Sequence, residues 1–289
     1  MSQNDTPYTP ASGEIEAFFK AIEVGDSTYV RDIVVQHPDA VNWRYDAGFV
    51  PLQWAFMEAW KSDERAALAD FLIDNGADPN AQLPNGSPLL VDAIVDAPDK
   101  FAVRLVEAGA DISWKSPGGP DELQVAGQTV LMYAAGWNCL DLARLLLDRG
   151  VDIHAKDASG KTAVMNAAYA GKAEMVELLV SRGADIHDKD ANGKTVLMYA
   201  ASGGKKEVVD LLTGLGAALE GRTADGDDIR DLARKSRRKD GPSAVEDAFR
   251  RVTDEAVNAV VNGLDRPVAA RRLQLKPKTL SSWCRLPSG

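Results

Sequence analysis

The residues that could perform chemistry are few and widely spaced. Two of the three histidines, His154 and His187, lie 33 residues apart in the similar strings VDIHAKD and ADIHDKD. If these strings occupy the same place in neighbouring repeats, the two imidazoles lie roughly 8–10 Å apart, whereas a zinc ion binds its ligands at about 2 Å. We therefore interpret both histidines as turn residues and predict no metal site.

The other candidates for catalysis show no catalytic motif in the sequence. Cys139 precedes a leucine-rich helical pattern and has no flanking base that would activate its thiol. We interpret Asp157 and Asp190, which are also 33 residues apart, primarily as turn residues. The chain contains no glycine-rich phosphate loop, no GxGxxG before a helix, no HExxH and no GxSxG. We predict that the protein is not an enzyme and uses no cofactor.

The charge of the chain is distributed unevenly. The formal net charge is −10, but six basic residues against one acidic residue after Gly263 give that segment +5, so the preceding 263 residues carry −15. An acidic body repels nucleic acid and anionic membranes and attracts basic proteins. We predict that the partner is a protein of basic character and that the chain binds neither nucleic acid nor a membrane.

The composition is typical of a soluble chain with an apolar core. Hydrophobic residues make up 45% of it, and no apolar run approaches the roughly 20 residues of a membrane-spanning helix. The first residues show no basic segment followed by an apolar stretch, and two cysteines are too few for a disulfide framework. These features predict a cytoplasmic protein.

A period of 33 residues organises the chain. The strings GKTAVMNAAYAG and GKTVLMYAASGG begin at Gly160 and Gly193, 33 residues apart. A second series of glycines keeps the same register with spacings of 33, 41, 33 and 33: Gly76, Gly109, Gly150, Gly183 and Gly216. Such a period predicts stacked units, each of which buries its apolar face against its neighbours.

The residues within one period indicate two helices and an extended finger. Thr129, Thr162 and Thr195 precede apolar runs at helical spacing, and a threonine hydroxyl can cap a helix N-terminus. The Ala-Ala pairs at 134–135, 167–168 and 200–201 allow two helices to approach closely. Each second helix ends at a glycine suited to the left-handed conformation, and the Asn192-Gly193 dipeptide predicts the turn of a finger.

These features resemble the ankyrin repeat family from about Ser12 to Gly263. The family pattern T-P-L-H-x-A is similar to VPLQWA from Val50, SPLLVDA from Ser87, TVLMYAA from Thr129 and Thr195, and TAVMNAA from Thr162. The resemblance implies an all-α solenoid of helix-turn-helix units with β-hairpin-like fingers. Residues 1–11 then form an N-terminal arm, 12–263 the ankyrin repeat solenoid with its terminal caps, and 264–289 a basic C-terminal tail.

The resemblance also implies where a partner binds, because ankyrin proteins usually contact partners with their finger tips and the inner faces of their first helices. Aromatic side chains there are typical interface anchors, and acidic turns at Asp157 and Asp190 form a rim that accelerates association. The expected partner-binding residues are Trp114, Asp121, Glu122, Trp137, Asp157, Lys161, Tyr169, Asp190 and Lys194. For Trp137 and Tyr169 the alternative is packing between repeats, whereas Tyr133 and Tyr199 are expected inside the stack.

We therefore predict a non-enzymatic protein-protein interaction module that serves as an inhibitor, an immunity-type protein or a regulatory partner. The alternative function is an assembly scaffold or oligomer. In that case the basic tail docks on the acidic body of its own or a neighbouring chain through Leu273, Leu275, Leu280 and Trp283. The protein is then a monomer or a tail-mediated oligomer.

Overall fold

The computed structural model describes residues 10–45, 48–59, 63–83, 86–96, 99–118, 125–235 and 242–251. The chain divides into two compact units, Met1–Ile112 and Ser113–Gly289, which we call the N-terminal and C-terminal units. The basic tail at 264–289, with the leucines and the tryptophan expected to dock, lies outside the described residues, as does most of the arm at 1–11.

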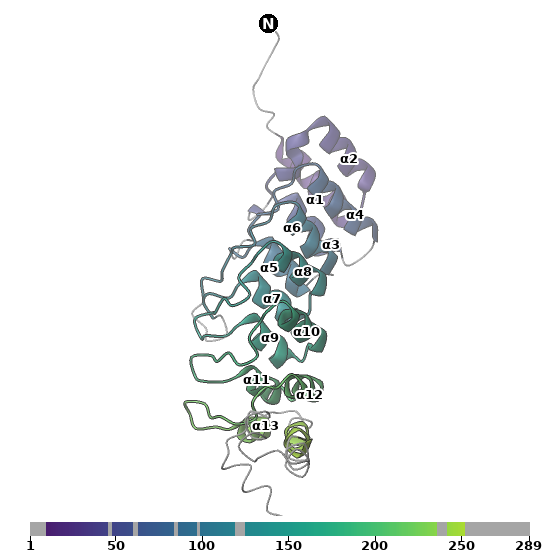
Figure 1. Ribbon diagram of the computed structural model, residues 1–289. Coiled ribbons are helices and arrows are strands. Elements are labelled where there is room, and N and C mark those ends of the chain that lie inside the picture. Colours follow the sequence, from purple (N-terminus) through teal and green to yellow (C-terminus); the bar gives the residue numbers. More distant parts are fainter. Residues whose placement is uncertain are drawn as a thin grey trace, which may run out of the picture. The chain divides into compact units, whose positions relative to one another are not determined.

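The N-terminal unit consists of paired helices. Helix α1 packs against α2 and α3, α3 against α4, and α5 against α6. A short 3-10 helix, η1, connects the first pair to α3. The bounds are α1 Ser12–Val24, α2 Ser27–Gln36, η1 Pro38–Asn42, α3 Pro51–Ala59, α4 Asp63–Asp74, α5 Leu89–Asp96 and α6 Asp99–Glu107 (Figure 1).

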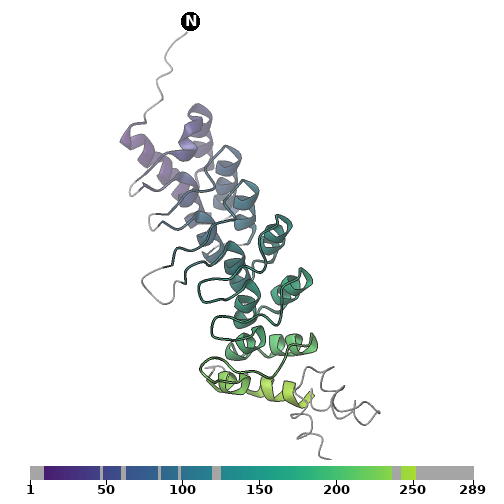
Figure 2. The ribbon, with the colours of Figure 1, turned by 60° about the vertical axis from the view of Figure 1, so that its left-hand side comes forward.

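The C-terminal unit repeats one helix pair and one finger. The first helices α7, α9, α11 and α13 pack in series, the second helices α8, α10 and α12 pack beside them, and the fingers project from the side of the first helices (Figures 1 and 2). The bounds are α7 Val130–Trp137, α8 Leu140–Asp148, α9 Ala163–Ala170, α10 Ala173–Ser181, α11 Val196–Ser202, α12 Lys206–Gly214 and α13 Ile229–Lys235, with a further helix described at 242–251. This arrangement confirms the predicted all-α repeat fold.

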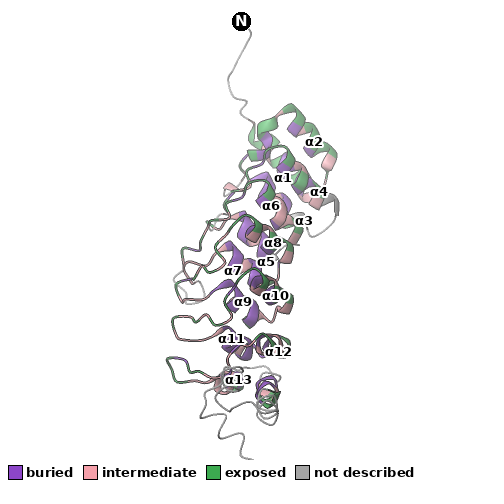
Figure 3. Ribbon diagram, in the orientation of Figure 1, coloured by how far each residue is buried: buried purple, intermediate pink, exposed green. Residues whose placement is uncertain are grey.

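The core of the C-terminal unit lies between successive first helices. All six alanines of the Ala-Ala pairs at 134–135, 167–168 and 200–201 are fully buried. Because alanine is small, the first helices approach closely, and leucines of the second helices such as Leu146 and Leu179 close the core from the other side. Figure 3 shows this distribution, with buried residues on the inner helix faces and exposed residues along the fingers.

The helix ends follow the sequence expectations with one exception. Thr129 and Thr195 accept hydrogen bonds from the backbone N–H groups of Met132 and Met198, each at 3.3 Å. The expectation was wrong for Thr162, whose side chain makes no capping bond and whose buried Oγ1 has no partner among the described residues. The glycines after the second helices have the predicted left-handed φ, from 78° at Gly150 to 101° at Gly109.

Neighbouring fingers of the C-terminal unit are joined by a ladder of backbone hydrogen bonds. The N–H groups of residues 158, 191 and 224, spaced by 33, donate to carbonyl oxygens in the preceding finger: Ala158 to Ala126 at 2.8 Å, Ala191 to Ser159 at 2.9 Å and Ala224 to Asn192 at 2.8 Å. At Gly160, where φ is +79°, a Cβ atom would lie only 2.6 Å from the Ala191 nitrogen. Glycine is therefore required there both by its φ and by the close approach of the next finger.

Two repeats differ in length from the 33-residue period: the one that contains α4 and the one whose finger precedes α7. Helix α4 has 12 residues, whereas α8, α10 and α12 have 9 each, so the extra length of this repeat lies partly within a helix. In the finger before α7, Ser116 Oγ donates to the Val125 carbonyl at 2.6 Å and accepts from the Gln128 N–H at 2.9 Å. These bonds close the base of the extended finger, and its residues 119–124, which include Asp121 and Glu122, lie outside the described residues.

Candidate functional site

Two large aromatic side chains are exposed on neighbouring first helices of the C-terminal unit. Trp137 is the last residue of α7 and Tyr169 the penultimate residue of α9, and each is 55% exposed. Helices α7 and α9 pack directly against each other. The structure thus places both residues on adjacent helix ends, and the alternative that they fill the space between repeats does not hold.

Tyr199 of α11 connects Tyr169 to the lysines of the fingers. Its ring meets the Tyr169 ring edge-on, with centroids 6.4 Å apart. The Lys194 ammonium lies 4.3 Å and the Lys161 ammonium 5.7 Å from the centroid of the Tyr199 ring, which are cation–π distances. As expected, Tyr199 itself is buried in the stack.

Hydrogen bonding and burial shift the pKa values of Tyr199 and Lys194. The Tyr199 hydroxyl donates to Asp190 Oδ2 at 2.6 Å. Burial, followed by this hydrogen bond, raises the pKa of Tyr199 far above its usual value, so the hydroxyl remains a donor. Burial also lowers the pKa of Lys194, although the charge of Asp190 opposes this effect.

The carboxylates of Asp157 and Asp190, expected as an acidic rim, accept hydrogen bonds within the finger turns. Asp157 is only 6% exposed, and its Oδ1 accepts from the Ser159 N–H, the Ser159 hydroxyl and the Lys161 N–H. Asp190 Oδ1 accepts from the N–H groups of Asn192 and Lys194. Both carboxylates hold the finger turns, because backbone N–H groups converge on them.

The other expected residues fall into two groups. Trp114 lies at the base of the extended finger, where its ring is 6.2 Å from that of Tyr133 on α7, so it belongs to the same side as the exposed aromatics. Lys161 and Lys194 join the cluster through Tyr199. Asp121 and Glu122 lie outside the described residues. We call Trp114, Tyr133, Trp137, Tyr169 and Tyr199, together with Lys161 and Lys194, the aromatic face.

The groups considered first for chemistry occupy structural positions. His154 and His187 are exposed finger-turn residues, and Cys139 is buried before α8. In the part of the chain that the structure describes, no three His, Cys, Asp or Glu side chains gather closely enough to hold a metal ion. No helix among the same residues is long and apolar enough to cross a bilayer.

The acidic charge is concentrated in one unit. Residues 1–112 contain 7 basic and 19 acidic side chains and so carry −12, whereas residues 113–289 contain 26 basic and 24 acidic side chains and carry +2. The acidic body expected from the sequence is therefore mainly the N-terminal unit.

A sequence profile described as ankyrin repeats (3 copies) matches residues 56–157 and 152–223, which together make up more than half of the chain. The chain belongs to the ankyrin repeat family. Ankyrin repeats generally serve as protein-protein interaction modules and are typically non-catalytic. The crystal structure of the human ASB11 ankyrin repeat domain is similar in fold, with a TM-score of 0.63 and 22% identity over 80% of this chain and 96% of that chain. Comparison with curated proteins finds no significant match.

Sequence reasoning missed one feature of the N-terminal unit. Phe19, Tyr45 and Trp54 line a hollow beside α1, although these residues are widely spaced in the sequence. The available signal was Trp54, which occupies the variable position of the ankyrin pattern in VPLQWA. The corresponding residues in later repeats are Tyr133 and Tyr199, so this position repeatedly supplies an aromatic ring beside the fingers.

The hydrogen bond between Tyr199 and Asp190 should contribute measurably to stability. We expect Tyr199→Phe to lower the free energy of unfolding by about 1–2 kcal/mol, because it removes a short bond to a charged acceptor and keeps the ring. Tyr169→Phe is the matched control, since the Tyr169 hydroxyl has no hydrogen-bond partner among the described residues, and it should change stability by less than about 0.5 kcal/mol. Urea unfolding followed by circular dichroism measures both. Equal effects of the two substitutions would show that the bond contributes nothing.

Proposed function

We propose that the protein binds a protein partner through the aromatic face of its C-terminal unit and acts by occupying that partner. The observation that carries the proposal is the exposure of Trp137 and Tyr169, each 55% accessible on adjacent helix ends. Exposed aromatic clusters are unfavourable in an isolated soluble protein, and tryptophan and tyrosine are the side chains most enriched among interface hot spots. A module that acts only by covering a surface of its partner is suited to the role of an inhibitor or regulatory protein.

The bracing of the face supports this proposal. The backbone ladder joins the fingers at residues 126, 159 and 192, and Lys156 of one finger pairs with Asp188 of the next at 2.9 Å. Because the fingers and first helices are held together, little conformational freedom is lost when a partner binds. Binding through such a surface is therefore favoured over binding through an isolated loop.

The charge around the aromatic face indicates the chemistry of the contacting segment. The Asp157 and Asp190 carboxylates are engaged in the finger turns, whereas the Lys161 and Lys194 ammonium groups lie over the Tyr199 ring. We infer that the partner segment on this face carries carboxylates rather than basic groups. The basic partner expected from the overall composition would instead be attracted to the acidic N-terminal unit.

Affinity capture with matched variants tests the proposal. The full chain, Trp137→Ala/Tyr169→Ala and Leu215→Ala are each used as bait in extracts of the cells that make the protein, and bound proteins are identified by mass spectrometry. Leu215 is also exposed, at 45%, but follows the second helix α12. We expect a partner that the wild type and the Leu215 variant retain and the aromatic double variant loses. If all three baits retain the same proteins, the aromatic face is not the binding surface.

A further inference from the structure

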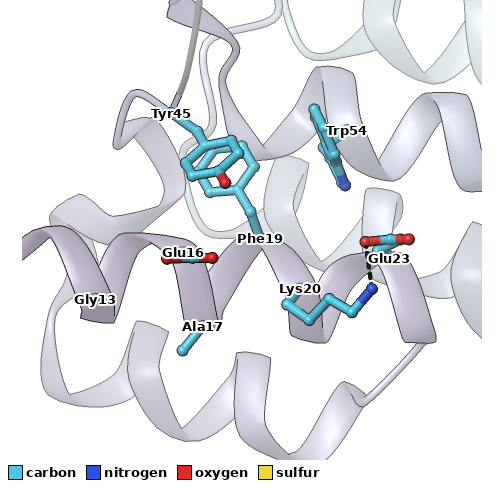
Figure 4. A pocket seen from close by; sticks show the side chains of 8 residues that line it. All are labelled: Gly13, Glu16, Ala17, Phe19, Lys20, Glu23, Tyr45 and Trp54. Carbon is cyan, nitrogen blue, oxygen red and sulfur yellow. Dashed lines mark hydrogen bonds and ion pairs between the residues drawn. The ribbon is translucent and has the colours of Figure 1, made fainter.

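The N-terminal unit contains a hollow of about 650 Å³ between α1 and the start of α3. Figure 4 shows that Tyr45 lies over Phe19, that Trp54 stands to one side of them, and that Glu16, Lys20 and Glu23 of α1 form the lower edge. A volume of this size is within the range of sites for small ligands or single peptide side chains with their flanking backbone. The hollow lies on a different unit from the aromatic face, so an inference from it does not depend on the proposed function.

The aromatic rings form a corner. Tyr45 stacks on Phe19 with centroids 5.0 Å apart, and Trp54 stands at 87° to Tyr45 with centroids 5.9 Å apart. The faces of aromatic rings carry partial negative charge, and a cation within about 6 Å of a ring centroid is attracted to it. A planar cation in this corner would lie against one ring and beside the other.

The two glutamates and one lysine at the edge have a net negative charge, which favours a cation as well. Among the described residues, the exposed Glu16 forms no ion pair and Glu23 pairs only with Lys20, at 2.9 Å. The surrounding unit carries −12, so its field attracts cations toward the hollow. A guanidinium group matches both kinds of wall, because it stacks flat on aromatic rings and donates two parallel hydrogen bonds to a carboxylate.

The indole of Trp54 adds a hydrogen-bond donor, its buried Nε1, that lacks an acceptor among the described residues. A buried donor without an acceptor is unfavourable, and a carbonyl oxygen would satisfy it. An arginine residue within a peptide supplies both groups, a guanidinium cation at the end of its side chain and a carbonyl oxygen in its backbone.

We propose that this hollow binds an arginine side chain of a partner peptide. The guanidinium lies in the corner of Tyr45 and Trp54 and pairs with Glu16 and Glu23, and a peptide carbonyl accepts the Trp54 Nε1–H. The site takes arginine rather than lysine because its walls are planar rings and carboxylates, which a planar two-pronged cation matches better than a compact ammonium.

Indole N–H signals in ¹H–¹⁵N spectra of the full chain test the proposal. The chain has 6 tryptophans, and the Trp54 signal is identified by its loss in Trp54→Phe. On titration with the blocked peptide Ac-Gly-Arg-Gly-NH₂ we expect this signal to move downfield, as it does when an N–H gains an acceptor. The same peptide with citrulline in place of arginine has nearly the same shape without the charge, and it should leave the signal in place.

Variants of the carboxylates complete the test. In Glu16→Gln/Glu23→Gln the dissociation constant for the arginine peptide should rise about fivefold or more, whereas Glu177→Gln, an exposed change on α10 of the other unit, should leave it unchanged. All three glutamates are on the surface, so thermal melting should confirm that both variants fold. The proposal is overturned if citrulline shifts the Trp54 signal with the same midpoint, if the signal does not move, or if the double variant binds like the wild type.

Discussion

Replacing Leu197 with alanine is expected to lower the free energy of unfolding by about 2–5 kcal/mol. Leu197 is 1% exposed in α11, a helix that packs against α9, α12 and α13 at once. A shorter side chain leaves a cavity that the braced helices cannot fill completely, so both the lost burial and the cavity contribute to the cost. Urea unfolding followed by far-UV circular dichroism measures the change.

Glu177→Ala provides the control for Leu197→Ala. Glu177 lies on α10 with its side chain exposed, so this substitution should change stability by less than about 0.5 kcal/mol. In a stack of repeats each unit contacts only its neighbours, so the loss at Leu197 should appear first as unfolding of the α9–α13 region. A Leu197 variant that is as stable as the Glu177 variant would contradict the repeat register described above.

Trp137→Ala is expected to weaken binding of the partner by about 2–4 kcal/mol, or roughly 30- to 1000-fold in the dissociation constant. In the proposed complex this ring, which is 55% exposed in the free protein, is buried, so its loss should mainly raise the dissociation rate. The same exposure means that little native packing is lost, and the melting temperature should remain close to that of the wild type. Surface plasmon resonance with the captured partner measures both rate constants.

Lys161→Gln distinguishes the role of charge from that of the anchor. Its ammonium lies 5.7 Å from the Tyr199 ring at the edge of the aromatic face, so its removal should slow association and reduce the salt dependence while it leaves dissociation nearly unchanged. Wild-type kinetics in the Trp137 variant, together with normal folding, would place the binding surface elsewhere on the molecule.

The sequence predicted the parts of this fold that depend on the repeat period. The glycines that follow the second helices in the repeat register all have positive φ, and the Ala-Ala pairs are buried contacts of the first helices. Trp137 and Tyr169 follow the Ala-Ala positions, where the resemblance to ankyrin proteins implied a binding surface with packing between repeats as the alternative, and the structure shows both side chains exposed. Periodicity determined the glycine and alanine positions, because each repeat presents the same residue to the same neighbour.

Other parts of the site could not be read from the sequence. An aspartate in a finger can face solvent or hold the turn, and only the convergence of the N–H groups of Ser159 and Lys161 on Asp157 shows that it holds the turn. The hollow at Tyr45 and Trp54 depends on one irregular loop and on residues that do not repeat. Features that depend on contacts not repeated along the chain can be identified only from the three-dimensional structure.

The hydrogen-bond ladder between the fingers restricts which insertions and deletions this chain can accommodate. Each rung joins a carbonyl and an N–H group at fixed places in consecutive periods, so a single residue inserted at a tip would misalign the rungs on both sides of it. Excision of residues 161–193 would instead bring Ala224 opposite the Ser159 carbonyl and restore a rung. The natural extension at 117–124 obeys the same constraint, since it precedes Ala126, the first acceptor of the ladder. Binding surfaces in this chain can therefore be lengthened or shortened by whole repeats, or enlarged ahead of a rung.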